Sequence, residues 1–177
     1  YKFYPTEEAT KTAFKLGKID LVQNLLTADP FIKWHSSEVS VPINPNQIVT
    51  LFFNTQDKLL SDKSIRQALI YAIDKNALGS RALSPIASNS WAYNPQVKEY
   101  AYDLERVKEI LKDIPEKVKS EAKIELVTTP SLVTKADIIA KAWNSVGIKT
   151  VVQVSSVIPS EFQSFLTILD VPSDPAQ

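Results

Sequence analysis

Few of the 177 residues have the types and spacing that catalysis requires. The single histidine, His35, could act as a general base for an adjacent serine, Ser36 or Ser37. Neighbouring residues on one short segment rarely reach the geometry of a catalytic triad, and no serine motif accompanies them. We therefore expect His35 to be a loop or surface residue and the chain not to be an enzyme, with a hydrolase as the least favoured alternative.

Cofactor and metal chemistry has little support in the composition. The chain has no cysteine, which excludes disulfides, thiol nucleophiles and cysteine-based zinc sites. Its three glycines, Gly17, Gly79 and Gly147, lie too far apart to form a phosphate-binding loop. Asp170 and Asp174 could ligate a metal, but two carboxylates without a third ligand favour a role in a turn. We expect no metal and no cofactor.

The aromatic residues fall into two groups. Phe14 and Trp143 occupy apolar stripes of predicted helices, where aromatic side chains belong to the core. Trp91 and Tyr93 lie within residues 80–101, which have weak periodicity and neighbouring Asn and Ser residues. This composition is typical of a ligand-contact wall, because each aromatic supplies contact area and a polar group. Packing alone also explains each of them.

Charge and hydropathy restrict the partners. Lys plus Arg and Asp plus Glu both total 20, so a neutral surface offers no general attraction to nucleic acid. No apolar run approaches the roughly 20 residues that cross a bilayer. The chain has no methionine and opens at Tyr1, so we expect it to be a segment of a longer protein, and the absence of a targeting sequence does not indicate where that protein is located.

The beginning of the chain predicts a helix, a connection and a strand. Thr6 caps a helix over residues 7–16, which has acidic residues in its first turn. Residues 29–46 contain three prolines and predict an irregular connection. The β-branched and aromatic run over residues 47–54 predicts a buried strand.

The next helix has the strongest pattern in the sequence. Ser61 or Asp62 caps it, and Asp74 ends it and caps a short continuation. Its apolar stripe has the spacing of one buried face: Ile65, Ala68, Leu69, Ala72 and Ile73. Arg66 lies beside this stripe, which predicts a structural role, either pairing with a carboxylate or capping backbone carbonyls. Asn54, at the end of the preceding strand, is expected to hold a turn.

The second half alternates strands and helices. Asp103 caps a helix that a proline stops. Residues 124–128 and 148–154 predict strands on either side of a helix over 132–146, an order that suggests a βαβ unit. Apolar spacing predicts a last short helix carrying Phe162, Phe165 and Leu166, followed by a loop over residues 170–177.

A longer pattern begins at Phe53-Asn54-Thr55. After a short gap comes D-x-x-I-R-Q-A-L-x-x-A-I-D over residues 62–74. Further matches follow in order: Pro85-Ile86, Ser90-Trp91-Ala92, Tyr102-Asp103 ahead of a helix, Val146-Gly147-Ile148 before a strand, and Asp174-Pro175. The pattern resembles the signature of the family 5 extracellular solute-binding proteins, the dipeptide, oligopeptide and nickel receptors of ABC importers.

The resemblance implies an α/β fold with an open mixed sheet flanked by helices, as one lobe of a type II periplasmic-binding-protein fold. Residues 1–46 would be the end of the neighbouring lobe and a connection. Residues 47–177 would be the main ligand-binding lobe, incomplete at its C-terminal end. Family members are far longer, with a second lobe formed by sequence on both sides.

The resemblance also implies which residues face the ligand. The cleft-facing parts would be the segment 88–94, the turn after the strand ending at Thr128, and the loop 169–174. We expect ligand contacts from one set of residues: Ser90, Trp91, Tyr93, Asn94, Thr129, Ser131, Asp170 and Asp174. A second set is assigned to the scaffold: Asn54, Asp62, Arg66, Asp74 and Asp103.

The function implied is the substrate-binding component of an ABC importer, which captures a peptide or similar small solute by closure of two lobes. The partner is a membrane permease, the location is the cell envelope (periplasmic or lipid-anchored), and we expect a monomer. The turn after Thr128 carries no acidic residue to meet a peptide amine. An alternative therefore stays open: a degenerate or sensor-type lobe that acts as an interaction module.

Overall fold

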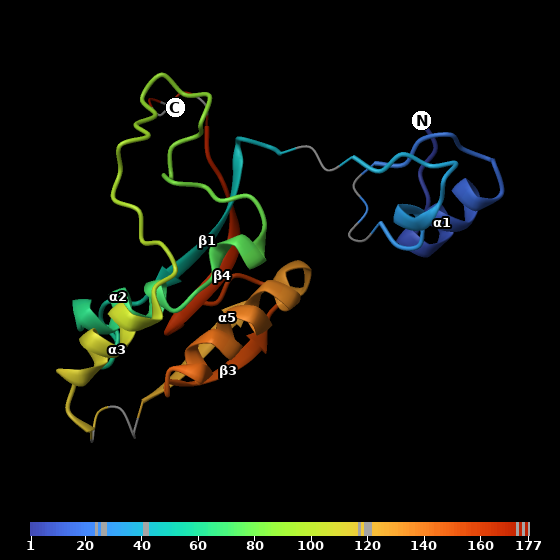
Figure 1. Cartoon of the computed structure of the whole chain (residues 1–177). Helices are drawn as coiled ribbons and strands as arrows, with labels where there is room; N and C mark the ends of the chain where they lie inside the picture. The colour runs from blue at the N-terminus through green and yellow to red at the C-terminus, as the bar shows by residue number, and fades with distance from the viewer. Residues whose placement is uncertain are drawn as a thin grey trace. The chain divides into compact units, whose positions relative to one another are not determined.

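The chain forms two compact units, Tyr1–Pro42 and Ile43–Gln177 (Figure 1). The computed structural model describes residues 1–23, 25, 28–40, 43–116, 118, 122–172, 174 and 176. The division falls within the predicted connection.

The first unit is built around one helix and an aromatic cluster. Helix α1 (Glu7–Lys15) begins at Thr6, whose hydroxyl oxygen accepts a hydrogen bond from the Ala9 amide at 3.2 Å. The short 3₁₀ helix η1 (Phe31–Lys33) carries the buried Phe31. The Phe31 ring packs edge-on against Phe14 and Trp34, at centroid distances of 5.0 and 5.3 Å. The predicted helix at the start of the chain is confirmed.

The second unit contains a four-stranded mixed sheet. Its strands are β1 (Gln47–Phe53), β2 (Lys123–Thr128), β3 (Lys149–Val154) and β4 (Ser164–Asp170). Their order across the sheet is β1-β4-β2-β3, with β1 antiparallel to β4 and the other three strands parallel. The expected open mixed sheet is confirmed, and residues 123–154 form the predicted βαβ unit.

Three helices of the described residues cover one face of this sheet. They are α2 (Lys63–Tyr71), α3 (Leu104–Lys112) and α5 (Val133–Ser145), and α5 follows the 3₁₀ turn η3 (Pro130–Leu132). Their apolar stripes join Ile124 and Leu126 of β2 and Leu166 of β4 in one core. Because alternate residues of a strand point to opposite faces, these strand residues all face the same helical layer.

Residues 162–166 correct one prediction. The expected short helix is absent, and Phe165 and Leu166 instead lie in β4. Leu166 belongs to the helix-side core. Phe165 points to the opposite face, and its ring packs at 5.7 Å against Phe162, which lies in the connection from β3. A strand buried on both faces reads as a continuous apolar run, which spacing alone does not distinguish from a helix.

The strand prediction for residues 47–54 was right in type and wrong in burial. Strand β1 lies at the edge of the sheet, and the side chains of Val49 and Phe52 are 45% and 39% exposed. A β-branched and aromatic composition favours a strand but does not determine its place in the sheet.

Candidate functional site

The candidate site lies at the end of the sheet where the parallel strands have their carboxyl ends. Strands β2 and β3 finish side by side at Thr128 and Val154, and the next amide, that of Ser155, donates to the Thr128 carbonyl at 2.8 Å. In open α/β sheets, ligands bind beyond the carboxyl ends of the strands. The predicted residues Thr129 and Ser131 lie there, and their hydroxyl oxygens are 3.2 Å apart.

Strand β4 extends beyond its neighbour β2. The pairing of β2 with β4 stops at Thr128 and Leu166, whereas the pairing of β1 with β4 continues to Gln47 and Asp170. Four residues of β4, 167–170, therefore have a strand partner on one side only. They span about 13 Å at 3.3 Å per residue.

The register shows which backbone groups are unpaired. Hydrogen bonds from Val171 N–H to the Asn46 carbonyl (2.7 Å) and from Asn54 N–H to the Gln163 carbonyl (2.8 Å) mark the bonded pairs of this ladder. Bonded and non-bonded pairs alternate in an antiparallel ladder, so the N–H and C=O groups of Ile168 and Asp170 point away from β1. Within the described residues no strand pairs with these groups on the side of β2. We call these unpaired N–H and C=O groups of Ile168 and Asp170, which lie beyond Thr128, the open inner edge of β4.

A long loop, residues 79–102, stands beside this end of the sheet. Arg81 and Glu99, 18 residues apart in the chain, meet near its base at 3.5 Å. Lys135 of α5 donates a hydrogen bond to the Leu78 carbonyl, at the end of the 3₁₀ helix η2 (Lys75–Leu78). The two ends of the loop are thereby joined to each other, and the start of the loop is held to α5.

The base of the loop also contains a half-buried amine. Lys75 Nζ donates to the carbonyls of Ile70 and Ile73, at 2.7 and 3.3 Å, and so caps the end of α2. Burial, together with the nearby Arg81, lowers the pKa of Lys75 to about 8. The two carbonyl bonds give this group a structural role as a helix cap.

The four ligand residues predicted in the loop have different surroundings. Ser90 is buried, and its hydroxyl oxygen accepts from the Ala92 amide at 3.2 Å. Asn94 Oδ1 accepts from the Gln96 amide at 2.8 Å. Trp91 is 79% exposed, and Tyr93 is half-buried. Ser90 and Asn94 thus stabilise the loop, whereas Trp91 presents a free aromatic surface.

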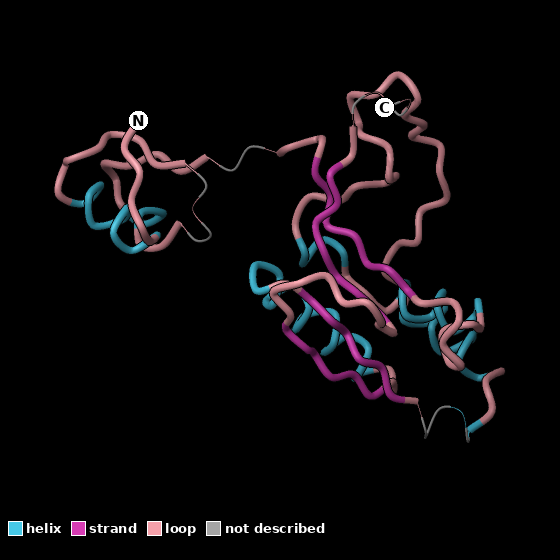
Figure 2. Tube along the Cα trace, turned by 180° about the vertical axis from the view of Figure 1, so that it is seen from behind, coloured by secondary structure: helices cyan, strands magenta, loops and turns pink. Residues whose placement is uncertain are grey.

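The two predicted aspartates lie near the end of β4. Asp170 Oδ1 accepts from Gln47 Nε2 at 2.8 Å, across the end of the β1–β4 ribbon. Asp174 Oδ1 accepts from the Ala176 amide at 3.0 Å, as expected of a turn, while Pro175 lies outside the described residues. In both Figure 1 and Figure 2 strand β4 ends next to the long loop. The described contacts do not join these aspartates to Thr129 or Ser131.

The residues assigned to the scaffold make local backbone contacts. Asp62, Asp74 and Asp103 precede α2, η2 and α3, and each carboxylate accepts an amide hydrogen bond at that N-terminus. Arg66 Nη1 donates to the carbonyls of Leu60 and Ser61 at 2.6 and 2.9 Å, so it caps carbonyls and pairs with no carboxylate in the described part of the chain. Asn54 holds the turn after β1, where its Oδ1 accepts from the amide of residue 56 at 2.9 Å.

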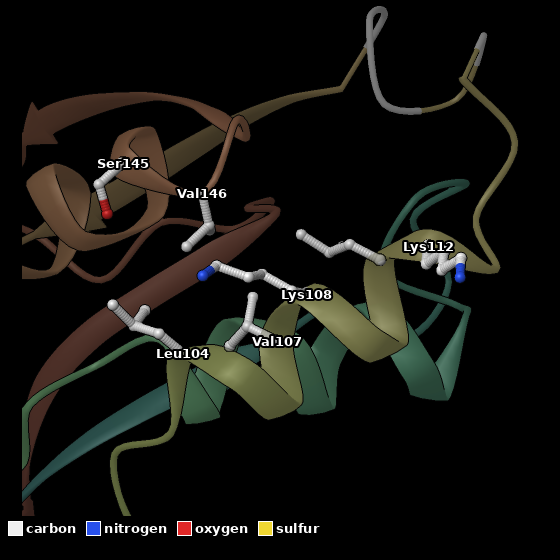
Figure 3. Close-up of a pocket in the computed structure, with 7 residues that line it drawn as sticks. Leu104, Val107, Lys108, Lys112, Ser145 and Val146 are labelled. Atoms are coloured by element: carbon white, nitrogen blue, oxygen red, sulfur yellow. The ribbon is translucent and has the colours of Figure 1, made fainter.

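Two surface grooves lie away from the predicted ligand residues. One, of about 510 Å³, is lined by α3 and the end of α5, and Figure 3 shows Val107 and Lys108 directed toward Val146. The Lys108 ammonium there pairs with Glu105 at 2.8 Å. The other, of about 380 Å³, lies between β1 and α2. No predicted ligand residue lines either groove.

The residues considered for catalysis and metal binding do not converge. Ser37 donates its hydroxyl to the carbonyls of Phe31 and Trp34, and His35 is exposed, with no hydrogen bond to a serine among the described residues. Across the described ranges, no three His, Cys, Asp or Glu side chains lie close enough together to hold a metal ion. None of the helices described has the length and apolar character of a bilayer span.

The sequence of this chain is similar to one family of proteins and to two of its curated relatives. Residues 1–164 match the family described as bacterial extracellular solute-binding proteins, family 5 middle. The chain is 29% identical over 116 residues to heme-binding protein A of Haemophilus influenzae, covering 58% of this chain and 21% of that protein. It is 39% identical over 71 residues to the dipeptide-binding protein of Escherichia coli, covering 36% of this chain and 13% of that protein.

Solved structures share the fold. The ABC transporter substrate-binding protein CtaP of Listeria monocytogenes has a TM-score of 0.80 and 17% identity, over 98% of this chain and 40% of that one. The oligopeptide-binding protein AppA of Bacillus subtilis, solved with a nonapeptide, has a TM-score of 0.66 and 17% identity, over 98% and 41%. The chain thus spans about two fifths of these structures, and its matches cover 21% and 13% of the curated relatives. The family match covers most of the chain, and the chain belongs to the bacterial extracellular solute-binding proteins of family 5.

Proposed function

We propose that this chain is part of a longer ABC-importer receptor and forms one wall of its ligand site. Residues 47–177 supply most of one lobe, and residues 1–46 lead into it from the neighbouring lobe. The lobes close on a small solute and hold it without covalent chemistry. The observation that carries the proposal is the open inner edge of β4 at Ile168 and Asp170.

An unpaired strand edge is suited to a peptide backbone. Ile168 and Asp170 direct donors and acceptors into the space above Thr128, so an extended peptide can add there as a short strand. Main-chain bonds give affinity that does not depend on the peptide's sequence. Thr129, Ser131 and the exposed ring of Trp91 then supply polar and apolar contacts near this edge.

The relatives support a peptide as the first candidate ligand. Their names include a dipeptide-binding protein and an oligopeptide-binding protein solved with a nonapeptide, but also a heme-binding protein and the nickel protein NikZ of Campylobacter jejuni with Ni(L-His). A sugar, a metal chelate or an opine-like compound is therefore an alternative cargo. The receptor acts as a monomer in the cell envelope, periplasmic or lipid-anchored, and delivers cargo to a membrane permease.

A backbone substitution tests the open edge. Ile168→Pro removes the N–H group that faces the ligand, while proline is tolerated at an unpaired strand edge. In the full-length receptor we expect Ile168→Pro to weaken peptide binding on the order of tenfold or more, the equivalent of one backbone hydrogen bond. Isothermal titration calorimetry with a peptide identified from a thermal-shift screen of peptide pools measures this loss.

The matched control is Ile168→Ala, which keeps the N–H group and removes only a side chain that is 45% exposed. We expect this variant to bind nearly as well as the wild type. Equal affinity for all three proteins would contradict strand addition at this edge. If no peptide pool raises the melting temperature of the full-length receptor, the degenerate or sensor-type lobe becomes the better interpretation.

A further inference from the structure

The carboxyl end of β3 carries an apolar side chain that the helical layer leaves exposed. Val152 of β3 packs against the helix-side core. Val154 is two residues further on and points to the same face of the sheet, but it is 54% exposed. It pairs with Thr128, the last residue of β2. Val154 therefore lies beside the space beyond Thr128.

This space is where an added peptide would lie. In the sheet order, β2 lies between β4 and β3. A peptide that pairs with the open inner edge of β4 continues the line of β2, because both run alongside β4. The second neighbour of such a peptide is therefore the segment that follows β3, which begins with Ser155.

The segment after β3 forms a tight turn. The Ser155 amide donates to the Thr128 carbonyl at 2.8 Å, so the turn begins next to the end of β2. The Ser155 hydroxyl donates to the Val157 carbonyl at 2.7 Å, and its oxygen accepts from the Val157 amide at 3.3 Å. Val157 and the next residue, Ile158, are 72% and 82% exposed. We call Val154, Val157 and Ile158 the apolar rim.

The strands and turns around the apolar rim carry no charged side chain. Residues 126–134, 150–160 and 162–169 contain no Asp, Glu, Lys, Arg or His, although Asp, Glu, Lys and Arg together make up 23% of the chain. Thr129 and Ser131 supply hydroxyl groups in the turn after β2, and these hydroxyl oxygens are 3.2 Å apart. The three segments therefore offer no ionic partner to an ammonium or a carboxylate group.

The charged residues that bound these segments have other positions or other partners. Glu125 and Lys149 lie near the starts of β2 and β3, at the opposite end of these strands. Glu161 lies in the connection that returns from β3 to the start of β4. Lys135 donates to a backbone carbonyl at the end of η2, and Asp170 accepts from a side-chain amide of β1.

We infer that the cargo presents an apolar, uncharged part to the apolar rim, so that the receptor prefers peptides with hydrophobic side chains. Alternate residues of an added strand point to the same face of the sheet, and those on the face of Val154 meet the rim. A hydrophobic side chain gains there from leaving water, whereas an ammonium or a carboxylate would lose hydration without gaining a partner. The inference rests on the proposed function and narrows its cargo to one class of peptide.

Peptides that differ at one position test this preference. Isothermal titration calorimetry of the full-length receptor compares alanine-based peptides with Leu, Phe, Lys or Glu at one central position. We expect the Leu and Phe peptides to bind on the order of tenfold more tightly than the Lys and Glu peptides. Charged peptides that bind as tightly as the apolar ones would overturn the preference and leave the proposed function intact. If neither these peptides nor any peptide pool binds, the proposed function fails and this inference fails with it.

A charge placed in the apolar rim gives an independent measurement. Ile158→Glu changes a side chain that is 82% exposed, so we expect the melting temperature without peptide to stay unchanged. The affinity of this variant for the Leu peptide should fall on the order of fivefold, and its affinity for the Lys peptide should rise. Ile32→Glu, at a position of the first unit that is 65% exposed, is the matched control and should bind all four peptides as the wild type does. Identical peptide preferences for Ile158→Glu and the wild type would overturn the role of the apolar rim.

Discussion

At the scale of single residues, Asp57 connects three parts of the second unit. Its Oδ1 accepts from the amides of Leu59 and Leu60 at 2.9 and 3.0 Å, and its Oδ2 accepts from Gln163 Nε2 at 2.9 Å. Gln163 Oε1 in turn accepts from the Glu125 amide at 2.8 Å. The turn after β1 is thereby joined to the beginnings of β2 and β4.

Protonation of Asp57 weakens this network. Burial alone would raise the pKa of Asp57, but the hydrogen bonds from Gln163, Leu60 and Leu59 outweigh it and hold the pKa below its ordinary value of 3.8. A group with a depressed folded-state pKa contributes stability that is fully present above the unfolded value. That contribution is lost as the pH falls through the folded-state pKa.

We expect Asp57→Asn to lower the free energy of unfolding by about 1–2 kcal/mol at pH 7, because the new amide nitrogen would face Gln163 Nε2 with no acceptor between them. The difference from the wild type should shrink at an acidic pH below the folded-state pKa of Asp57, which is lowered from 3.8, because Asp57 itself is then protonated. Urea unfolding at pH 7 and at that acidic pH measures it. Asp137→Asn, at an exposed position on α5, is the control and should change stability little. An equal loss at both pH values would contradict the role of the charge.

At the scale of elements, Trp143 joins α5 to α2 and to the sheet. Its side chain is fully buried, and its Nε1 donates to the Leu69 carbonyl of α2 at 3.0 Å. Its ring stacks on Phe53 of β1 at 5.9 Å. One side chain therefore fixes the positions of two helices and an edge strand relative to one another.

We expect Trp143→Phe to destabilise the second unit by about 2–3 kcal/mol, since it leaves a cavity and removes the indole N–H. Trp91→Phe, at a position that is 79% exposed, should change stability by less than about 0.5 kcal/mol. Denaturant unfolding followed by circular dichroism compares the two variants. Similar losses would mean that the core tolerates repacking around residue 143.

At the scale of the whole molecule, the two units have separate cores. The buried side chains in the core of the second unit belong to residues between 60 and 166. The half-buried side chains packed against this core begin at Leu51 of β1. The buried aromatic of the first unit, Phe31, packs on Phe14 and Trp34 of the same unit. Stability of the second unit should not depend on the first.

We expect deletion of residues 1–42 to leave the urea midpoint and the near-ultraviolet circular dichroism of the second unit unchanged. The physical reason is that no core residue of the second unit is removed. Wild-type 177-residue chain is the reference. A midpoint shift equivalent to more than about 1 kcal/mol would show that the two units stabilise each other.

Much of this protein follows from the sequence alone. Local spacing of residues determines several features, whatever the surroundings of the segment. These features are the helix caps at Asp62, Asp74 and Asp103, the apolar stripe from Ile65 to Ile73, and the strand–helix–strand order of residues 123–154. The motif that begins at Phe53 also identified the family, because its residues and their order are specific.

Other features were decided only by the tertiary structure. Phe165 and Leu166 lie in a strand because the first residues of β4 are covered on both faces, and the local sequence does not indicate what will cover a segment. The open edges of β1 and β4 arise from the pairing register, which joins residues more than a hundred positions apart. The link from Asp57 to Gln163 spans 106 residues, so no motif could have indicated it. Local spacing determines elements, whereas unpaired edges and long-range bonds exist only once the strands have met.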